Sequence, residues 1–277
     1  GEGIRYACGI VAAFILILVL LKLIMFPQMI KEDMKNPIMA SVSGTFPMAL
    51  MLLSTYVKPF IGAAAQYIWY FAIALHIVLI VYFTIKFILK LDMTKVFASY
   101  YIVYVGIAVA AVTAPAYGQL GIGTATFWFG FVTLIALLIL VTVRYTKYKN
   151  VPEPAQPLFC IYAAPTSLCI AGYVQSVTPK SRTFLLAMLA VATVIYIIAL
   201  VKAIGYLKLK FYPSYAAFTF PFVISAIATK QTMACLAKME QPLPILKPVV
   251  LVETIIAAVL VIYTFIRFMG FLFSSNK

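Results

Sequence analysis

Three ionisable side chains, His76, Glu253 and Lys230, lie inside stretches that are otherwise apolar. Ionisable groups in such surroundings are costly and often mark proton or ion pathways. His76, the only histidine, is central in YFAIALHIVLIVYF, where a proton-coupled carrier would use a titratable group. Glu253 lies inside the last apolar stretch, and we expect it to form a hydrogen bond or an ion pair with a nearby lysine. Both fall on helices expected to face lipid, so packing is favoured over transport for each.

Two roles are open for Lys230. It follows Phe220 by ten residues, which corresponds to about 15 Å along a helix. From there it would attract anions at an outer vestibule, or it would extend its ammonium group to the membrane surface while its stem stays in apolar surroundings. The second role is favoured, and the first keeps Lys230 among the candidate pore residues.

The sequence lacks the motifs of common enzymes. There is no phosphate-binding glycine loop, no HExxH and no nucleophile with suitably placed histidine and aspartate partners. The four cysteines have neither metal-ligand spacing nor a disulfide pattern, and we expect them to pack as small apolar side chains. We therefore expect no enzyme activity, no metal and no cofactor. The cysteines are Cys8, Cys160, Cys169 and Cys235.

The elements that position these residues must be membrane helices. Of the 277 residues, 65% are hydrophobic and 10% are charged, which excludes a soluble domain with a polar surface. Apolar runs of about 20 residues, the length that crosses a bilayer, recur between short breaks that contain charge or proline. They predict a single all-α transmembrane domain over residues 1–277, with helices at about 4–30, 37–57, 62–88, 95–117, 123–145, 157–175, 182–206, 214–237 and 248–272.

The positive charge follows from topology. The chain has 21 lysines and arginines against 7 acidic residues, a formal net charge of +14. If the N-terminus lies outside and the C-terminus lies in the cytoplasm, about twice as many basic residues fall on the cytoplasmic side, as the positive-inside rule requires. This pattern favours a multi-pass protein of the cell (inner or plasma) membrane that lies in a lipid bilayer, and it needs no nucleic-acid partner.

The predicted spans alternate between two compositions. One set is dense in Leu, Ile, Val and Phe, which suits an outer wall facing lipid. The other mixes small and hydroxyl-bearing residues with aromatics, which suits close packing or a polar path. Each member of the second set carries a proline, which costs about 3 kcal/mol in a helix interior and frees a carbonyl. We expect helix kinks around a central pore at Pro47, Pro115, Pro165 and Pro221.

A short sequence repeat supports this arrangement. Thr45, Phe46 and Pro47 recur as Thr219, Phe220 and Pro221 in another span of the same set. The match predicts an internal repeat of helical hairpins. Thr45, Phe46 and Thr219 are candidates for the pore lining; for Phe46, packing is an equally good interpretation.

Four segments together resemble the tellurite-resistance and dicarboxylate transporter family, which includes bacterial TehA and the slow anion channel of plant guard cells. The resemblance extends over the whole chain in order. It implies ten helices as five hairpins in a quasi-five-fold ring around a central pore, commonly in a homotrimer. Nine helices fall in this chain, and the first family helix is absent from it. The matching segments are GIVAAFILILVLLKLIMF, KNPIMASVSGTFPMALMLLS, APTSLCIAGYVQS and YAAFTFPFVISAIATKQT, which resemble the second, third, seventh and ninth helices.

The resemblance also implies a gate. The family's gating phenylalanine matches Phe220, whose ring would plug an anion pore. The neighbouring position, often glycine in bacterial members, is Pro221 here, which leaves open how freely the ring moves. A hydrophobic constriction of this kind resists hydrated ions by dewetting.

Three functions compete at this stage. A channel for small anions, gated by Phe220, is favoured because the kinked spans lack a buried titratable pair. A proton-coupled carrier for C4-dicarboxylates such as malate, or a transporter of sulfite or tellurite oxyanions, is the alternative. A membrane protein without transport activity would be expected to have uniformly leucine-rich helices, which the polar spans contradict.

Overall fold

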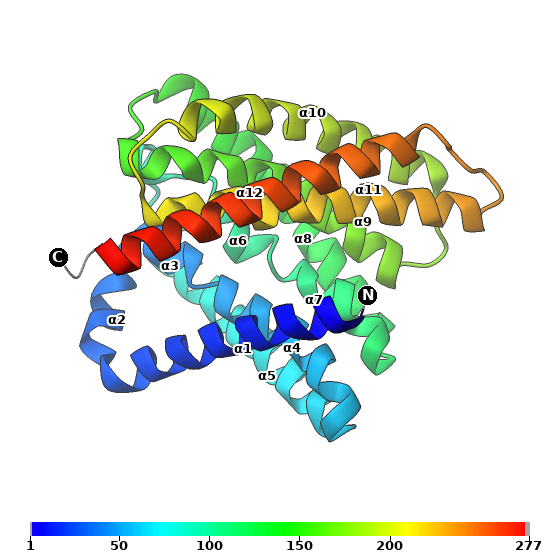
Figure 1. Ribbon diagram of the computed structural model, residues 1–277, viewed down its shortest axis with the longest axis horizontal. Helices are drawn as coiled ribbons and strands as arrows, with labels where there is room; N and C mark the ends of the chain where they lie inside the picture. The colour runs from blue at the N-terminus through cyan, green and yellow to red at the C-terminus, as the bar shows by residue number, and fades with distance from the viewer. Residues whose placement is uncertain (1, 275–277) are drawn as a thin grey trace.

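The computed structural model describes residues 2–274, and every regular element in that range is helical (Figure 1). The chain is therefore an all-α integral membrane protein. The elements in the first half are α1 (Glu2–Met25), α2 (Pro27–Asp33), α3 (Pro37–Val42), α4 (Thr45–Ile61), α5 (Ala64–Phe83), η1 (Thr84–Ile88), η2 (Met93–Lys95), α6 (Tyr100–Tyr104), α7 (Ala108–Thr113) and η3 (Ala114–Tyr117). The second half contains α8 (Leu120–Lys147), η4 (Glu153–Ala163), α9 (Ala164–Ser176), α10 (Arg182–Tyr206), η5 (Pro213–Phe218), α11 (Phe220–Lys238) and α12 (Leu246–Ser274).

Within residues 2–274, eight helical segments are long and apolar enough to cross a membrane. The expected span 95–117 is not one continuous helix. It is divided into η2, α6, α7 and η3, and the turn between α6 and α7 contains Gly106. The expected span 4–30 is also shorter, because α1 ends at Met25 and Pro27 begins the separate helix α2.

The helices form two layers. Helices α4, α7, α9 and α11 make an inner arc in chain order, in which each packs on the next. An outer helix covers each of them: α5 on α4, α8 on α7, α10 on α9 and α12 on α11, while α1 packs on the far end of the arc against α4. In Figure 1, α12 crosses in front of α11, and α1 runs beside α4 on the other side of the molecule.

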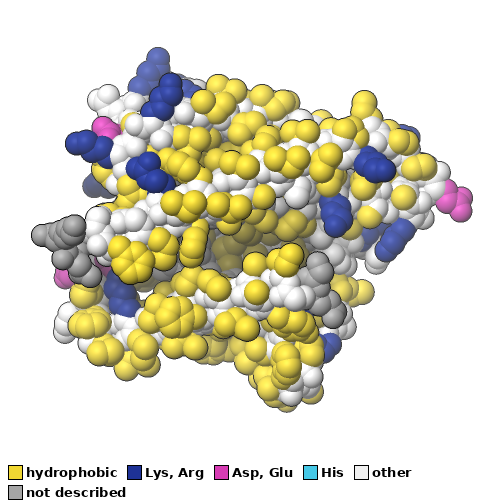
Figure 2. All heavy atoms as spheres, viewed as in Figure 1, with side chains coloured by type: hydrophobic (Ala, Val, Ile, Leu, Met, Phe, Trp, Pro, Cys, Tyr) yellow, Lys and Arg dark blue, Asp and Glu magenta, His cyan; other side chains and the backbone are white. Residues whose placement is uncertain are grey.

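Burial follows these layers. In the span Glu153–Ser176, 89% of the most apolar stretch is buried, against 22% for α12 and none for α1. The exposed side chains of the outer helices are mostly large and hydrophobic, as the space-filling view shows (Figure 2). Helix α9 is thus enclosed by protein on every side, whereas the outer helices present their apolar faces to lipid.

Each inner span is interrupted part-way along its length. The breaks separate α3 from α4, α6 from α7, η4 from α9, and η5 from α11. Three of the four prolines lie in the first turn after a break, and Pro115 lies in η3 at the end of its span. The expected kinks within continuous helices are therefore helix starts at Pro47, Pro165 and Pro221. A proline is tolerated in a first turn because its missing N–H would have had no partner there.

The break between α6 and α7 has room only for glycine. A Cβ atom at Gly106 would lie 2.7 Å from Met48 Sδ and 3.1 Å from His76 Cε1, and it would also collide with the Ile102 carbonyl. Gly106 therefore lets α4 and α5 approach the interrupted span closely.

Gly106→Ala is expected to lower the stability of the protein by about 1–3 kcal/mol, because the added methyl group forces neighbouring atoms apart. The measurement is the thermal unfolding midpoint of the purified protein in detergent. Gly205→Ala, within α10, is the matched control, because an added Cβ meets nothing within 4 Å there. A Gly106→Ala protein as stable as this control would show that the close approach is not required.

Candidate functional site

The two Thr-Phe-Pro segments begin two inner helices in nearly the same way. Thr45 is the first residue of α4, and Thr219 immediately precedes α11. The Thr45 hydroxyl donates to the Val42 carbonyl at 2.8 Å, and the Thr219 hydroxyl donates to the Ala216 carbonyl at 2.7 Å. Both bonds reach back three residues across a break. The sequence repeat is therefore also a repeat in local structure.

Phe220 lies where the inner helices meet. Its ring is half-buried, and it packs against a buried cluster to which α4, α5, α7, α9 and α11 all contribute. Phe46 is also half-buried, and its neighbour Pro47 is buried. The cluster that Phe220 contacts includes Met48, Met51, Ala108, Leu168 and Ile224.

One face of α11 is less buried than the rest of the helix. Phe220, Val223, Ile227 and Lys230 are half-buried or exposed, whereas the residues between them are buried. Their spacing of three to four residues places them in a single stripe along the helix. The Lys230 ammonium has no ion-pair or hydrogen-bond partner within residues 2–274. The candidate gate Phe220 and the unpaired ammonium group of Lys230 therefore lie on the same face of α11.

Serine hydroxyls form hydrogen bonds at the break before α9. The Ser167 hydroxyl lies 3.2 Å from the Ala163 carbonyl and 3.2 Å from the Ser225 hydroxyl of α11. Ser225 also donates to the Pro221 carbonyl at 2.9 Å. These contacts tie the first turns of α9 and α11 together. Sequence reasoning missed both serines, although the small polar residues around the two prolines were the signal that pointed to them.

His76 forms a hydrogen bond at the break between α6 and α7. It is fully buried on α5, and its Nε2 lies 2.9 Å from the Val103 carbonyl. A carbonyl only accepts hydrogen bonds, so Nε2 carries the hydrogen, and Nδ1 has no partner. The only histidine therefore satisfies a backbone group at the interruption of the neighbouring span.

Lysines bind the C-terminal ends of two inner spans. The Lys58 ammonium donates to the Ala116 carbonyl at the end of η3. The Lys180 ammonium donates to the Tyr173 carbonyl at 3.0 Å and to the Val177 carbonyl at the end of α9. Cations at helix C-termini offset the negative end of the helix dipole. In the described part of the chain, the N-cap residues of α4, α9 and α11 form no side-chain capping hydrogen bond, and no acidic residue lies in the first turn of any of these three helices.

Glu253 does not form the lysine pair that was one of its two expected contacts within residues 2–274. It is buried on α12, but it forms no ion pair with a lysine in the part of the chain that the structure describes, and its Oε2 has no hydrogen-bond partner. It lies on the helix that covers α11 and not on the inner arc. Of the cysteines, Cys160, Cys169 and Cys235 are buried as expected, whereas Cys8 is exposed.

The comparison with protein families agrees with this arrangement. The model of the family SLAC1, described as voltage-dependent anion channel, matches residues 4–271. The chain belongs to this family. A search of the curated proteins finds no match. The match confirms the resemblance inferred from the four segments. This SLAC1-family chain is therefore a multi-pass membrane protein in a family of anion channels and transporters.

His76→Leu is expected to lower stability by about 1–3 kcal/mol, because it leaves the buried Val103 carbonyl without a donor. His76→Gln keeps an amide N–H within reach and should recover part of the loss. The thermal unfolding midpoint in detergent measures both. If His76→Leu unfolds at the wild-type temperature, the histidine does not support the break.

Proposed function

We propose that the chain is an anion channel whose path follows the inner arc and is closed by the Phe220 ring. The observation that carries the proposal is the position of Phe220, in the first turn of a helix that begins inside the bundle, against a cluster formed by the inner helices and the outer helix α5. A large apolar ring at a narrow point excludes water and therefore hydrated ions. The family match supports the anion as the transported species.

Charge along the path also favours anions. Helices α4, α9 and α11 begin after breaks within their spans, and helix N-termini carry partial positive charge. No acidic residue occurs in α4, α7, α9 or α11. Lys58 and Lys180 offset the opposite, negative ends. Partial charges of this kind attract an anion without holding it as tightly as a buried lysine would.

A proton-coupled carrier of dicarboxylates, sulfite or tellurite oxyanions has less support. A carrier of this kind needs a titratable group that faces the substrate. His76 bonds the Val103 carbonyl from an outer helix, and Glu253 lies on the outer helix α12. Small inorganic anions are therefore the proposed substrates, with dicarboxylates as the alternative.

The proposed setting is a homotrimer in the cell (inner or plasma) membrane with a cytoplasmic C-terminus. The orientation is supported by the basic residues, which gather at one end of the predicted spans. The trimer is supported by the family resemblance alone.

Phe220→Ala is expected to raise anion flux by about tenfold or more, which corresponds to lowering the barrier by about 1.4 kcal/mol. The reason is that truncation opens the hydrophobic constriction to water. The measurement is chloride current in planar bilayers, or chloride efflux from liposomes, at equal protein content.

Phe71→Ala is the matched control, since Phe71 is 61% exposed on the outer helix α5 and the same atoms are removed. Its flux should stay at the wild-type level. Equal currents from a folded Phe220→Ala protein and the wild type would refute the gate, while saturable malate uptake driven by a pH gradient would favour the carrier.

A further inference from the structure

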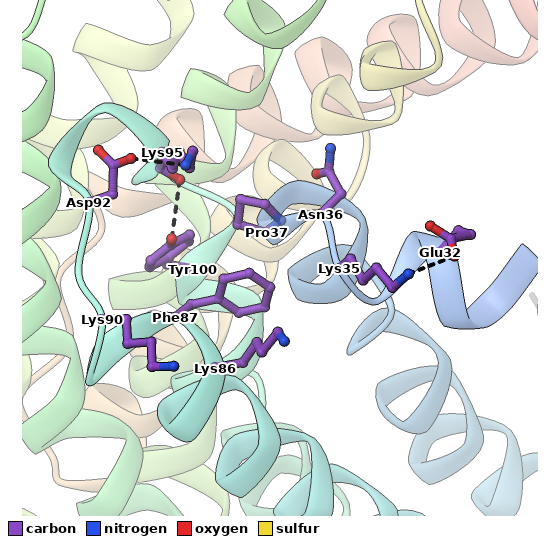
Figure 3. A pocket seen from close by; sticks show the side chains of 10 residues that line it. All are labelled: Glu32, Lys35, Asn36, Pro37, Lys86, Phe87, Lys90, Asp92, Lys95 and Tyr100. Carbon is purple, nitrogen blue, oxygen red and sulfur yellow. Dashed lines mark hydrogen bonds and ion pairs between the residues drawn. The ribbon is translucent and has the colours of Figure 1, made fainter.

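A basic pocket lies where the end of α2 approaches η1 and η2, beside the first residues of α3 and α6. It encloses about 490 Å³ and is lined by four lysines and two acidic residues (Figure 3). We call it the lysine pocket. Its charged residues are Lys35, Lys86, Lys90, Lys95, Glu32 and Asp92.

Two of the four lysines are already neutralised. Lys35 pairs with Glu32 at 2.7 Å, and Lys95 pairs with Asp92 at 3.0 Å. Hydrogen bonds from Thr94 and the contact with Lys95 lower the pKa of Asp92 to about 2, so this carboxylate stays ionised. The Lys95–Asp92 ion pair therefore stays charged at neutral pH.

Lys86 and Lys90 form no ion pair within residues 2–274. They follow one another by four residues, and Figure 3 shows both on the same side of the pocket, below Phe87. The lysine pocket thus holds two positive charges with no compensating acid. Two lysines four residues apart can both contact one anionic group that carries several acceptor oxygens. Phosphate is the common biological example.

Lys86 lies in the π-helix η1, and Lys90 lies in the turn that follows it. The Leu89 N–H bonds the Thr84 carbonyl at 2.9 Å, five residues earlier. The Thr84 hydroxyl also lies 2.7 Å from the Tyr104 hydroxyl, which ties the π-helix to α6. Single π turns are rare and occur frequently at functional sites. The π-helix and its bond to α6 therefore fix the backbone that carries Lys86, and Lys90 follows directly after it.

The surface beside the lysines is apolar. Ile85 is 59% exposed and Leu89 is 73% exposed, and they lie next to Lys86 and Lys90 in the chain. Such side chains face hydrocarbon, which places the lysines at headgroup depth. Basic pockets at this depth bind the phosphates of anionic lipids, although a soluble phosphate compound presents the same group.

We infer that the lysine pocket binds a phosphate group, carried either by an anionic phospholipid or by a soluble phosphate compound, through Lys86 and Lys90. The inference is independent of the proposed anion path, because neither lysine belongs to the inner arc.

The test compares the full chain with Lys86→Gln/Lys90→Gln in detergent. Binding of phosphatidylglycerol is measured by native mass spectrometry, and stabilisation by inorganic phosphate is measured from the unfolding midpoint. Each neutralised lysine should weaken binding about fivefold, so that the double variant binds about 30-fold more weakly. Lys208→Gln/Lys210→Gln is the control, since it removes the same charge from two lysines outside the pocket.

The two arms distinguish the source of the phosphate. Lysine-dependent retention of phosphatidylglycerol identifies a lipid headgroup, whereas lysine-dependent stabilisation by inorganic phosphate identifies a soluble compound. The inference is overturned if wild type binds neither probe, or if the pocket variant and the control variant bind equally well. Size-exclusion profiles of all variants show whether each is folded.

Discussion

The structure depends on the side-chain hydrogen bonds that backbone carbonyls accept where the inner spans break. In a bilayer no water is available to satisfy such groups, so each break must supply its own donor. Thr45 and Thr219 donate to carbonyls three residues earlier, Ser167 bonds the Ala163 carbonyl, and His76 bonds the Val103 carbonyl from a neighbouring helix. These donors allow four helices to begin inside the protein.

The two layers of helices have different surroundings: the outer layer contacts lipid and the inner layer is enclosed by protein. The outer helices present large apolar side chains to lipid and cover the inner arc, so they supply most of the lipid contact. The inner arc, enclosed by them, tolerates 3₁₀ segments, first-turn prolines and small polar residues that lipid would not. Broken helices place partial positive charge within the spans, and Phe220 lies at one of these starts. The proposed anion path and its proposed closure by the Phe220 ring both rest on these helix starts inside the protein.

The sequence predicted the helical class, the alternation of spans rich in large apolar residues with spans rich in small and polar residues, the internal repeat and the family. Hydrophobic run length and composition determine the helical class and the alternation of spans locally, whereas the repeat followed from the Thr-Phe-Pro match and the family from the resemblance of four segments. It did not predict that span 95–117 would be divided, because a five-residue helix, a turn at Gly106 and a second short helix have the same composition as one long helix. It also treated His76 as a candidate proton carrier, because the Val103 carbonyl that it bonds is 27 residues away in the chain. Prolines marked the breaks, but whether a helix bends or restarts there depends on contacts between spans.

We propose that the Phe220 ring faces the anion path, and chemical modification of a cysteine at this position tests its placement. Phe220→Cys is made in a Cys8→Ser background, since the other cysteines are buried. Chloride flux is measured before and after a sulfonate-bearing methanethiosulfonate reagent, which adds bulk and negative charge. If Phe220 closes the path, the substitution raises chloride flux and the reagent then abolishes the increase. The flux of Phe71→Cys stays at the wild-type level before and after the reagent. A folded Phe220→Cys protein whose flux matches wild type and ignores the reagent would contradict the proposal.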